Sequence, residues 1–136
     1  MRRLFHNARL ICPAQAIDAH GWLLTENELI HSTGSGQASN DLKLGADELV
    51  DCQGFTLGPG LVDMRAETGD PGAEHLETLD TLLGAAAAGG VTSLAIQPST
   101  DPVIDNASLI NSLQMRASRR KGPTLYCHGA MSRNLD

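Results

Sequence analysis

The pattern of apolar and polar positions divides the chain into two stretches of different character. Residues 1–57 contain apolar pairs and triplets separated by glycine, proline and polar residues, which is typical of a small unit of β-strands. Within this stretch, the Ser-Thr-Gly-Ser-Gly segment at residues 32–36 predicts a flexible turn. The predicted strands lie at residues 4–5, 10–11, 22–24, 28–30, 48–52 and 54–57.

From residue 58 onward, apolar runs alternate with helical patterns. The runs at 60–64, 91–96 and 124–127 predict buried strands. Between them, the spacing of leucine and alanine predicts one helix over residues 73–88 and a second from an N-cap at Asp105 to Arg120. This order of strands and helices predicts right-handed crossovers and a parallel sheet, an α/β arrangement.

Charged residues near the ends of these helices fit the helix dipole. Glu74 and Glu77 are expected in the first turn of the first helix, where acidic groups are favoured. Arg116, Arg119 and Arg120 are expected near the end of the second, where basic groups are favoured.

The length of 136 residues allows one domain or two incomplete ones. A closed eight-stranded α/β barrel needs about 250 residues. A three-stranded parallel sheet has two bare edges, so we expect the chain to be the front part of a larger structure and to associate with other protein. The predicted boundary separates residues 1–57 from residues 58–136.

Composition narrows the range of partners. Ten basic and sixteen acidic residues give a net charge of −6, and there are only four aromatic residues, which argues against nucleic acid as a partner. The polar residues His6, Asn7 and Arg9 interrupt any signal-peptide core, and no apolar run approaches the roughly 18 residues of a membrane span. The three cysteines have no metal-ligand spacing and are interpreted as buried thiols. We therefore expect a soluble, cytoplasmic protein without membrane contact.

Three stretches carry a specific resemblance. Residues 59–72 are PGLVDMRAETGDPG, residues 77–93 are ETLDTLLGAAAAGGVTS, and residues 98–102 are PSTDP. In order and spacing they resemble dihydroorotase, the cyclic amidohydrolase of pyrimidine biosynthesis, whose motifs run P-G-L-[IV]-D-x-H-x-H-x-R-x-P-G, then E-T-x-x-x-A-A-A-x-G-G-[VI]-T, then M-P-N-T-x-P. With the predicted N-terminal strands included, the resemblance covers nearly the whole chain.

The resemblance implies a distorted TIM barrel that carries a small β-sandwich built from both chain ends. Residues 1–57 would form the N-terminal half of the sandwich. Residues 58–136 would form the first three βα units of the barrel, which in this chain is incomplete.

The positions that carry function in the family are changed. The two zinc-binding histidines of the family correspond to Arg65 and Glu67, its substrate-binding arginine to Gly69, and its substrate-binding asparagine to Ser99. Arginine stays protonated and cannot bind a metal, and one carboxylate beside it is a poor site. We therefore expect no catalytic, substrate-binding or metal residue at these positions. Arg65 and Glu67 are interpreted as a salt bridge across the lost site or as solvated charges.

The scaffold positions of the family motifs are retained. They are Asp63, Pro71, Gly72, Gly89, Gly90 and Pro98. Loss of functional residues with retention of scaffold residues is the pattern expected when catalysis is no longer required but folding is.

The five histidines form no H-x-H or H-E-x-x-H motif. His128 stands out because it follows the third predicted strand, and barrel sites lie at the carboxyl ends of strands. The remaining zinc ligands of the family lie on later strands, so this chain alone is not expected to assemble the metal centre or to hold a cofactor.

Two functional hypotheses follow from the resemblance. The first is a catalytically inactive pseudoenzyme of the pyrimidine pathway, not an enzyme in this chain, that supports assembly of aspartate carbamoyltransferase as part of an oligomer or complex. The alternative is a zinc-dependent hydrolase that cleaves a cyclic amide C–N bond, which requires a missing C-terminal part and a replacement metal site. A non-functional fragment is the third possibility.

Overall fold

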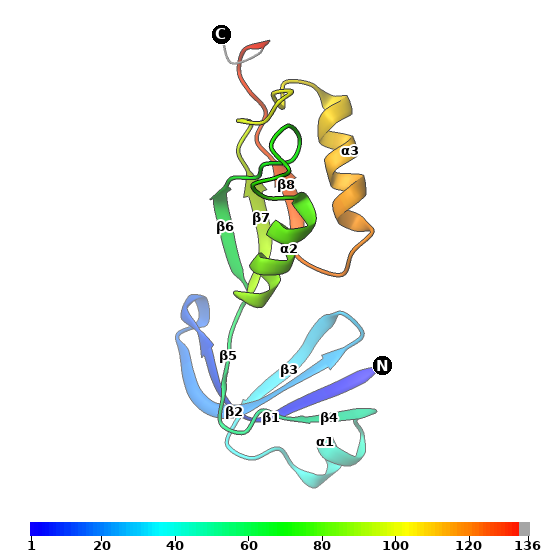
Figure 1. The fold of residues 1–136 in the computed structure, drawn as a ribbon. Coiled ribbons are helices and arrows are strands. Elements are labelled where there is room, and N and C mark those ends of the chain that lie inside the picture. The colour runs from blue at the N-terminus through cyan, green and yellow to red at the C-terminus, as the bar shows by residue number, and fades with distance from the viewer. Residues whose placement is uncertain (134–136) are drawn as a thin grey trace. The chain divides into compact units, whose positions relative to one another are not determined.

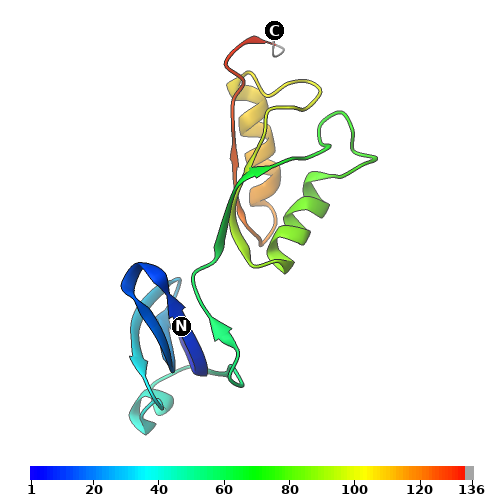
Figure 2. The ribbon, with the colours of Figure 1, turned by 90° about the vertical axis from the view of Figure 1, so that its left-hand side faces the viewer.

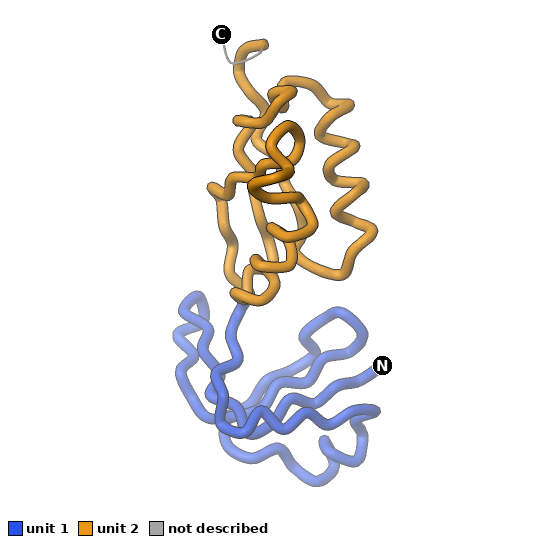
Figure 3. Tube along the Cα trace, viewed as in Figure 1, with its two compact units in different colours: residues 1–59 blue, residues 60–136 orange. Residues whose placement is uncertain are grey.

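The structure is a computed structural model, and it describes residues 1–133. The chain forms two compact units, Met1–Pro59 and Gly60–Asp136, shown in different colours in Figure 3. The boundary between them lies two residues after the one that the sequence pattern predicts. Residues 134–136 of the predicted second domain lie outside the described residues.

The first unit is built on one five-stranded sheet (Figure 1). Its strands β1, β2 and β3 form an antiparallel meander, and β4 and β5 both run parallel to β1. The strands are β1 (Arg2–Cys12), β2 (Ile17–Glu26), β3 (Leu29–Ser35), β4 (Glu48–Asp51) and β5 (Thr56–Leu57). The strand β1 is therefore central, and the short predicted pairs 4–5 and 10–11 are parts of this single strand.

The predicted turn over residues 32–36 is wrong, because residues up to Ser35 belong to β3 and pair with β2. The glycine at position 34 has a packing role. A β-carbon added to Gly34 would lie 2.5 Å from a ring carbon of Trp22, so the indole needs a residue without a side chain here. Within residues 32–36, it is Gly36, with a φ of +75°, that has a backbone typical of a turn glycine.

A short helix completes the core of the first unit. The helix α1 (Asn40–Leu44), which the sequence pattern did not predict, begins after Ser39, whose hydroxyl accepts a hydrogen bond from the Leu42 amide. It is held on the sheet by a small cluster in which buried Leu4, Leu24 and Ala38 contact Leu42. The one-turn η1 (Pro13–Gln15) connects β1 and β2.

The second unit has the predicted α/β arrangement. Three parallel strands form the sheet β6-β7-β8, and both helices lie on the same side of it (Figure 2). The elements are β6 (Leu61–Ala66), α2 (Leu79–Ala88), β7 (Val91–Ile96), α3 (Ala107–Ser118) and β8 (Thr124–Cys127). The described residues thus contain two βα units and a third strand.

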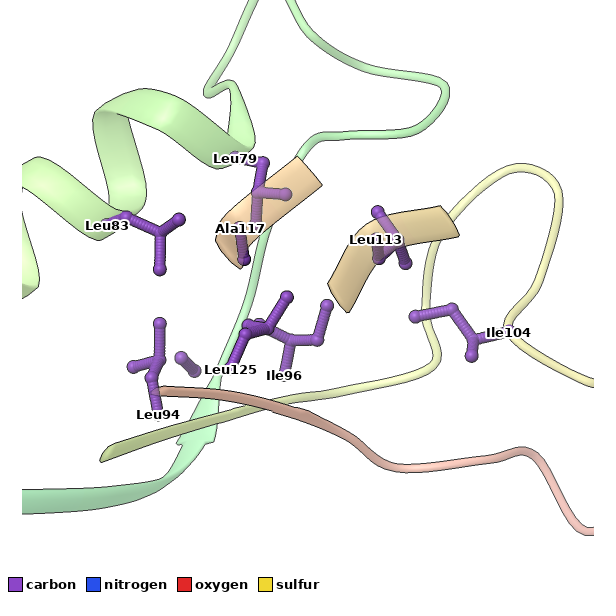
Figure 4. Packing of buried hydrophobic residues seen from close by; sticks show 9 residues of the cluster. Leu79, Leu83, Leu94, Ile96, Ile104, Leu113, Ala117 and Leu125 are labelled. Carbon is purple, nitrogen blue, oxygen red and sulfur yellow. The ribbon is translucent and has the colours of Figure 1, made fainter. Parts of the chain in front are cut away.

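The core of the second unit lies between the sheet and its two helices. Figure 4 shows strand residues Leu94, Ile96 and Leu125 facing residues of both helices, which are Leu79, Leu83, Leu113 and Ala117. These side chains are almost completely buried. At about 25 cal/mol per Å² of buried apolar surface, such a cluster is the main source of stability for a unit of this size.

Both helices begin later than the apolar pattern predicts. The helix α2 begins at residue 79 rather than 73, so Glu74 and Glu77 lie in the preceding loop and not in the first turn, and Leu76 is exposed. The reason is a capping box. The Thr81 amide donates to the Thr78 hydroxyl at 3.2 Å, and the Thr78 amide donates to the Thr81 hydroxyl at 3.0 Å.

The second helix has a different N-cap from the predicted one. The Leu109 amide donates to the Asn106 side chain at 3.0 Å, which makes Asn106 rather than Asp105 the N-cap of α3. The helix ends at Ser118, two residues before the predicted Arg120. Among the described residues, no helix combines the length and apolarity that a membrane span requires.

Replacing Thr78 by alanine is expected to lower the free energy of unfolding by about 1 kcal/mol, because the Thr81 amide at the start of α2 loses the hydroxyl that accepts its hydrogen bond. Ser112→Ala, which removes an exposed hydroxyl inside α3, is the control and is expected to change stability by less than about 0.5 kcal/mol. Urea unfolding followed by circular dichroism measures both. Equal stability of Thr78→Ala and wild type would show that the capping box does not stabilise α2.

Candidate functional site

The candidate site lies where the parallel strands of the second unit end. Pairing of β6 with β7 is interrupted between Asp63 and Ala66. The Asp63 carboxylate accepts a hydrogen bond from the Arg65 amide at 2.9 Å, and Nε2 of His128 donates to the Met64 carbonyl at 3.0 Å. Since a carbonyl only accepts, Nε2 carries the proton of this imidazole. His128, singled out for its place after β8, thus stabilises the irregular end of β6.

Arg65 and Glu67 flank a buried residue and are themselves exposed. Ala66 between them is only 8% exposed and belongs to the core. Among the ion pairs of the described residues there is none between Arg65 and Glu67. The predicted salt bridge between these two side chains is therefore wrong, and both are charges exposed to solvent. The site therefore presents a permanent cation and a separate carboxylate to solvent.

Gly69 occupies a position with no space for a side chain. A β-carbon added there would lie 2.2 Å from the carbonyl oxygen of Ala73 and 2.7 Å from that of Glu77. Real β-carbon contacts are not this short, and both oxygens belong to backbone, which does not move easily. The loop is also closed on itself by a hydrogen bond from the Ala73 amide to the Gly69 carbonyl. The loop between β6 and α2 is therefore built around a residue without a side chain.

Ser99 lies in the loop between β7 and α3 and is exposed. The residues that follow Ser99 fix the conformation of this loop through hydrogen bonds and burial. The Thr100 hydroxyl donates to the Pro102 carbonyl at 2.8 Å, and Ile104 is completely buried. The Asp101 amide donates to the Pro71 carbonyl at 3.0 Å, so this loop lies directly against the one that contains Gly69.

A buried ion pair under these loops was missed by the sequence analysis. The Asp70 residue is 3% exposed, and its two carboxylate oxygens accept from the two terminal nitrogens of Arg116, one of them at 2.9 Å. The same carboxylate accepts from the Leu79 amide at 3.1 Å. The bonds from Arg116 hold the pKa of Asp70 below its usual value, although burial acts in the opposite direction.

Asp70 thus ties the loop, the start of α2 and the third turn of α3 together. From the sequence, Arg116 was expected to interact with the dipole at the end of the second helix. In the structure, the Arg116 guanidinium forms an ion pair with Asp70. A usable signal was present, because Arg116 follows inward-facing Leu113 by three residues and therefore lies next to the buried face of the helix.

The described residues do not fit a zinc centre. Zinc is bound by imidazole, thiolate and carboxylate groups, most often four. Position 65 offers a guanidinium without a free lone pair, and Glu67 is a single exposed carboxylate. Across residues 1–133, no group of three or more histidine, cysteine, aspartate or glutamate side chains is arranged to hold a metal ion.

The cysteines are free thiols, but they are only partly buried rather than fully buried as interpreted from the sequence. Burial raises the pKa of Cys127, and burial together with the nearby Asp51 carboxylate raises that of Cys52. A raised pKa keeps both side chains in the unreactive thiol form. They add no nucleophile to the site.

Solved structures identify the class of fold. The chain is similar to the L-hydantoinase (dihydropyrimidinase) from Arthrobacter aurescens, with a TM-score of 0.74, 20% identity and coverage of 94% of this chain and 27% of that one. It is also similar to the ochratoxinase of A. niger, with a TM-score of 0.64, 16% identity and coverage of 95% and 31%. At these identities the likeness concerns the fold alone, which is that of amidohydrolases of the hydantoinase type.

Curated relatives identify the family. The dihydroorotase of Anaplasma phagocytophilum (strain HZ) is 41% identical over 129 residues, which are 94% of this chain and 29% of the relative. The dihydroorotase of Wolbachia sp. subsp. Brugia malayi (strain TRS) is 45% identical over 111 residues, 82% of this chain and 25% of the relative. No family model matches the chain. The chain belongs to the dihydroorotase family, as its motifs predict, and it spans less than a third of the length of these relatives.

Proposed function

We propose that this chain is a catalytically inactive member of the dihydroorotase family that acts through contacts with other proteins. The observation that carries the proposal is the space around Gly69. A substrate-binding arginine at this position needs a β-carbon, and the loop has backbone oxygens 2.2 Å and 2.7 Å from where that atom would lie. The loop is thus adapted to the absence of the side chain.

The chemistry at the end of β6 supports the same proposal. Two histidines at positions 65 and 67 would supply neutral nitrogen ligands, whereas Arg65 carries a fixed positive charge that repels a divalent cation. Within residues 1–133, the exposed Glu67 belongs to no group of three or more histidine, cysteine, aspartate or glutamate side chains that could hold a metal ion, and the exposed Ser99 lacks the amide of asparagine. Each change removes a different part of the machinery that the family resemblance implies.

The exposed apolar side chains of the second unit support a role in association. Leu61, Val62 and Met64 on β6 and Tyr126 on β8 are each more than half exposed. Such apolar residues on a sheet favour coverage by other protein. In this proposal the protein partner is aspartate carbamoyltransferase, the complex is cytoplasmic, and the fold is the first part of a TIM barrel.

The test combines metal content, turnover and complex formation. We expect purified chain to contain no stoichiometric zinc and to leave dihydroorotate unhydrolysed, with or without aspartate carbamoyltransferase. We expect the two proteins to elute together from a size-exclusion column. Stoichiometric zinc with turnover by the chain would overturn the proposal and support the alternative, a zinc-dependent hydrolase of cyclic amides.

Two methionine variants test the association surface. Met64→Asp places a charge among the apolar residues of β6 and is expected to weaken the complex at least tenfold, since a buried unpaired charge costs several kcal/mol. Met115→Asp changes a methionine of similar exposure on α3 and is expected to leave the complex intact. Equal binding by both variants would exclude the sheet as the contact surface.

A further inference from the structure

A cavity of about 330 Å³ opens in the first unit, which contains none of the positions discussed so far for catalysis. Its lining collects basic and amide side chains from three separate elements. His6 and Asn7 come from β1, His20 from β2 and Lys43 from α1, and Gln37 lies in the segment before α1. No aspartate or glutamate is among the residues that line it. In a chain with a net charge of −6, this is a local reversal of charge.

The strand β1 is irregular where it borders the cavity. The register of β1 on β2 shifts between Phe5 and Ala8, and Asn7 has a φ of +55°. The backbone groups released by this bulge have other partners. The carbonyls of His6 and Asn7 accept from the amides of Cys52 at 2.9 Å and Gly54 at 2.7 Å. The bulge is therefore a built feature of the sheet.

One carboxylate lies behind the cavity and orients its wall. Asp51 pairs in register with His6, and its carboxylate accepts from the Asn7 side chain at 2.9 Å and from the Gln53 amide at 2.8 Å. These bonds, together with the charges of His6 and Lys43, hold the pKa of Asp51 below its usual value. Asp51 thus stays negative and offsets one positive charge near the cavity.

We propose that this cavity binds a small tetrahedral oxyanion, either inorganic phosphate or the phosphate group of a small metabolite. Imidazolium, ammonium and amide groups are donors that suit phosphate oxygens, and the volume suffices for a group of that size. Near neutral pH, Lys43 and Asp51 balance each other. Any proton that the two imidazoles take up adds positive charge to the cavity and strengthens its attraction for the anion.

Other charged groups near the histidines do not change this direction. Arg9 pairs in register with His20, and its guanidinium forms an ion pair with Asp18 at 2.7 Å, so together they contribute little net charge. On the remaining sides, Lys43 faces the cavity from α1 and Asp51 stands behind it in β4. The charge of the cavity is therefore set by its own lining together with Asp51.

The test uses the whole chain and sulfate, which is a dianion at the pH of the experiment. Sulfate is added at constant ionic strength while the histidine ring signals are followed by NMR. We expect the signals of His6 and His20 to shift with a Kd on the order of 1 mM at about pH 6. The His31 and His75 signals are expected to stay in place.

Matched variants separate this site from general charge attraction. Lys43→Gln is expected to weaken sulfate binding by about fivefold, whereas Lys121→Gln, which removes an exposed lysine of the second unit, is expected to leave it unchanged. Unaltered far-ultraviolet circular dichroism verifies that each variant is folded. Equal effects of the two lysine variants, or absence of shifts at His6 and His20 up to about 20 mM sulfate, would overturn the proposal.

Two competitors identify the source of the anion. Inorganic phosphate and glycerol 2-phosphate are each added to the sulfate complex. Displacement by both supports a site for the phosphate group of a metabolite, and displacement by inorganic phosphate alone supports a site for the free ion. Failure of both to displace sulfate would overturn the assignment to phosphate. None of these outcomes depends on whether the chain binds zinc or a protein partner.

Discussion

Replacing Gly69 by alanine is expected to lower the free energy of unfolding by about 2 to 3 kcal/mol, and replacing it by arginine by at least as much. The added β-carbon would lie 2.2 Å from the Ala73 carbonyl oxygen, so the loop between β6 and α2 must open. Opening separates Ala73 from Gly69 and disturbs the loop that carries Asp70. Urea unfolding of the chain, followed by circular dichroism, measures the change.

The control is another glycine only fifteen residues away. Gly84 lies inside α2, and no atom is within 4 Å of a β-carbon added there. Gly84→Ala is therefore expected to stabilise the protein by about 0.5 to 1 kcal/mol, since alanine loses less backbone entropy in a helix. If Gly69→Ala were as stable as wild type, the loop would be free to accept a side chain, and the principal support for the proposed loss of catalysis would be gone.

Replacing Arg116 by methionine is expected to cost about 3 kcal/mol. The Asp70 carboxylate would remain buried with only the Leu79 amide as a donor, and a buried charge without its counter-ion is costly. Arg120→Met is the matched control. Its partner is Asp80, and both side chains of that pair are more than half exposed, so a loss below about 0.5 kcal/mol is expected.

Asp70→Asn is expected to cost less than Arg116→Met, about 1 to 2 kcal/mol. The amide oxygen of asparagine still accepts from the Leu79 amide, and the released Arg116 side chain, 46% exposed, is readily solvated. The ranking of the two variants thus follows from which partner is the buried one. A larger loss from Asp70→Asn would contradict this account.

Acid weakens the same ion pair, and the sign of the effect follows from the depressed pKa of Asp70. The contribution of this group to stability is fully present above its unfolded pKa near 3.8 and is lost as the pH falls through the lower pKa of the folded state. In Arg116→Met, burial without the guanidinium raises the pKa of Asp70. The stability difference between wild type and this variant is therefore expected to shrink between about pH 5 and pH 3 in urea titrations.

The fold was predictable where the local pattern and the tertiary environment agree. The strands at 91–96 and 124–127 are found where the sequence predicts them. A short apolar run bounded by turn residues is typical of a buried strand in a parallel sheet. The start of α2 was not predictable from the apolar pattern, because Leu76 continues the helical spacing by chance. The boundary is decided by the capping pair Thr78 and Thr81. Capping depends on side-chain geometry that periodicity does not contain.

The resemblance assigns residues to the candidate site, and this assignment stays a prediction, whereas the environment of these residues comes from the structure. The motif places Arg65, Glu67, Gly69 and Ser99 at the family positions, and the structure places these residues on β6 and the two loops that follow β6 and β7. The sequence did not reveal that Gly69 is enclosed by backbone or that Asp70 is buried beside it. The burial of Asp70 depends on its contact with Arg116 of α3, 46 residues away in the chain, and the enclosure of Gly69 depends on how the loop turns back on itself.

The central position of β1 has a consequence for the order of folding events. The strand pairs early with β2 in a local hairpin, but Arg3 finds its β4 partner Glu48 only 45 residues later, and Arg9 meets Thr56 later still. Contacts so far apart in sequence slow folding, because a long loop must close before they form. During synthesis, which proceeds from the N-terminus, one side of β1 therefore stays incompletely paired until residue 57 has emerged from the ribosome. This interval is the stage at which a chaperone would find an open strand edge to bind.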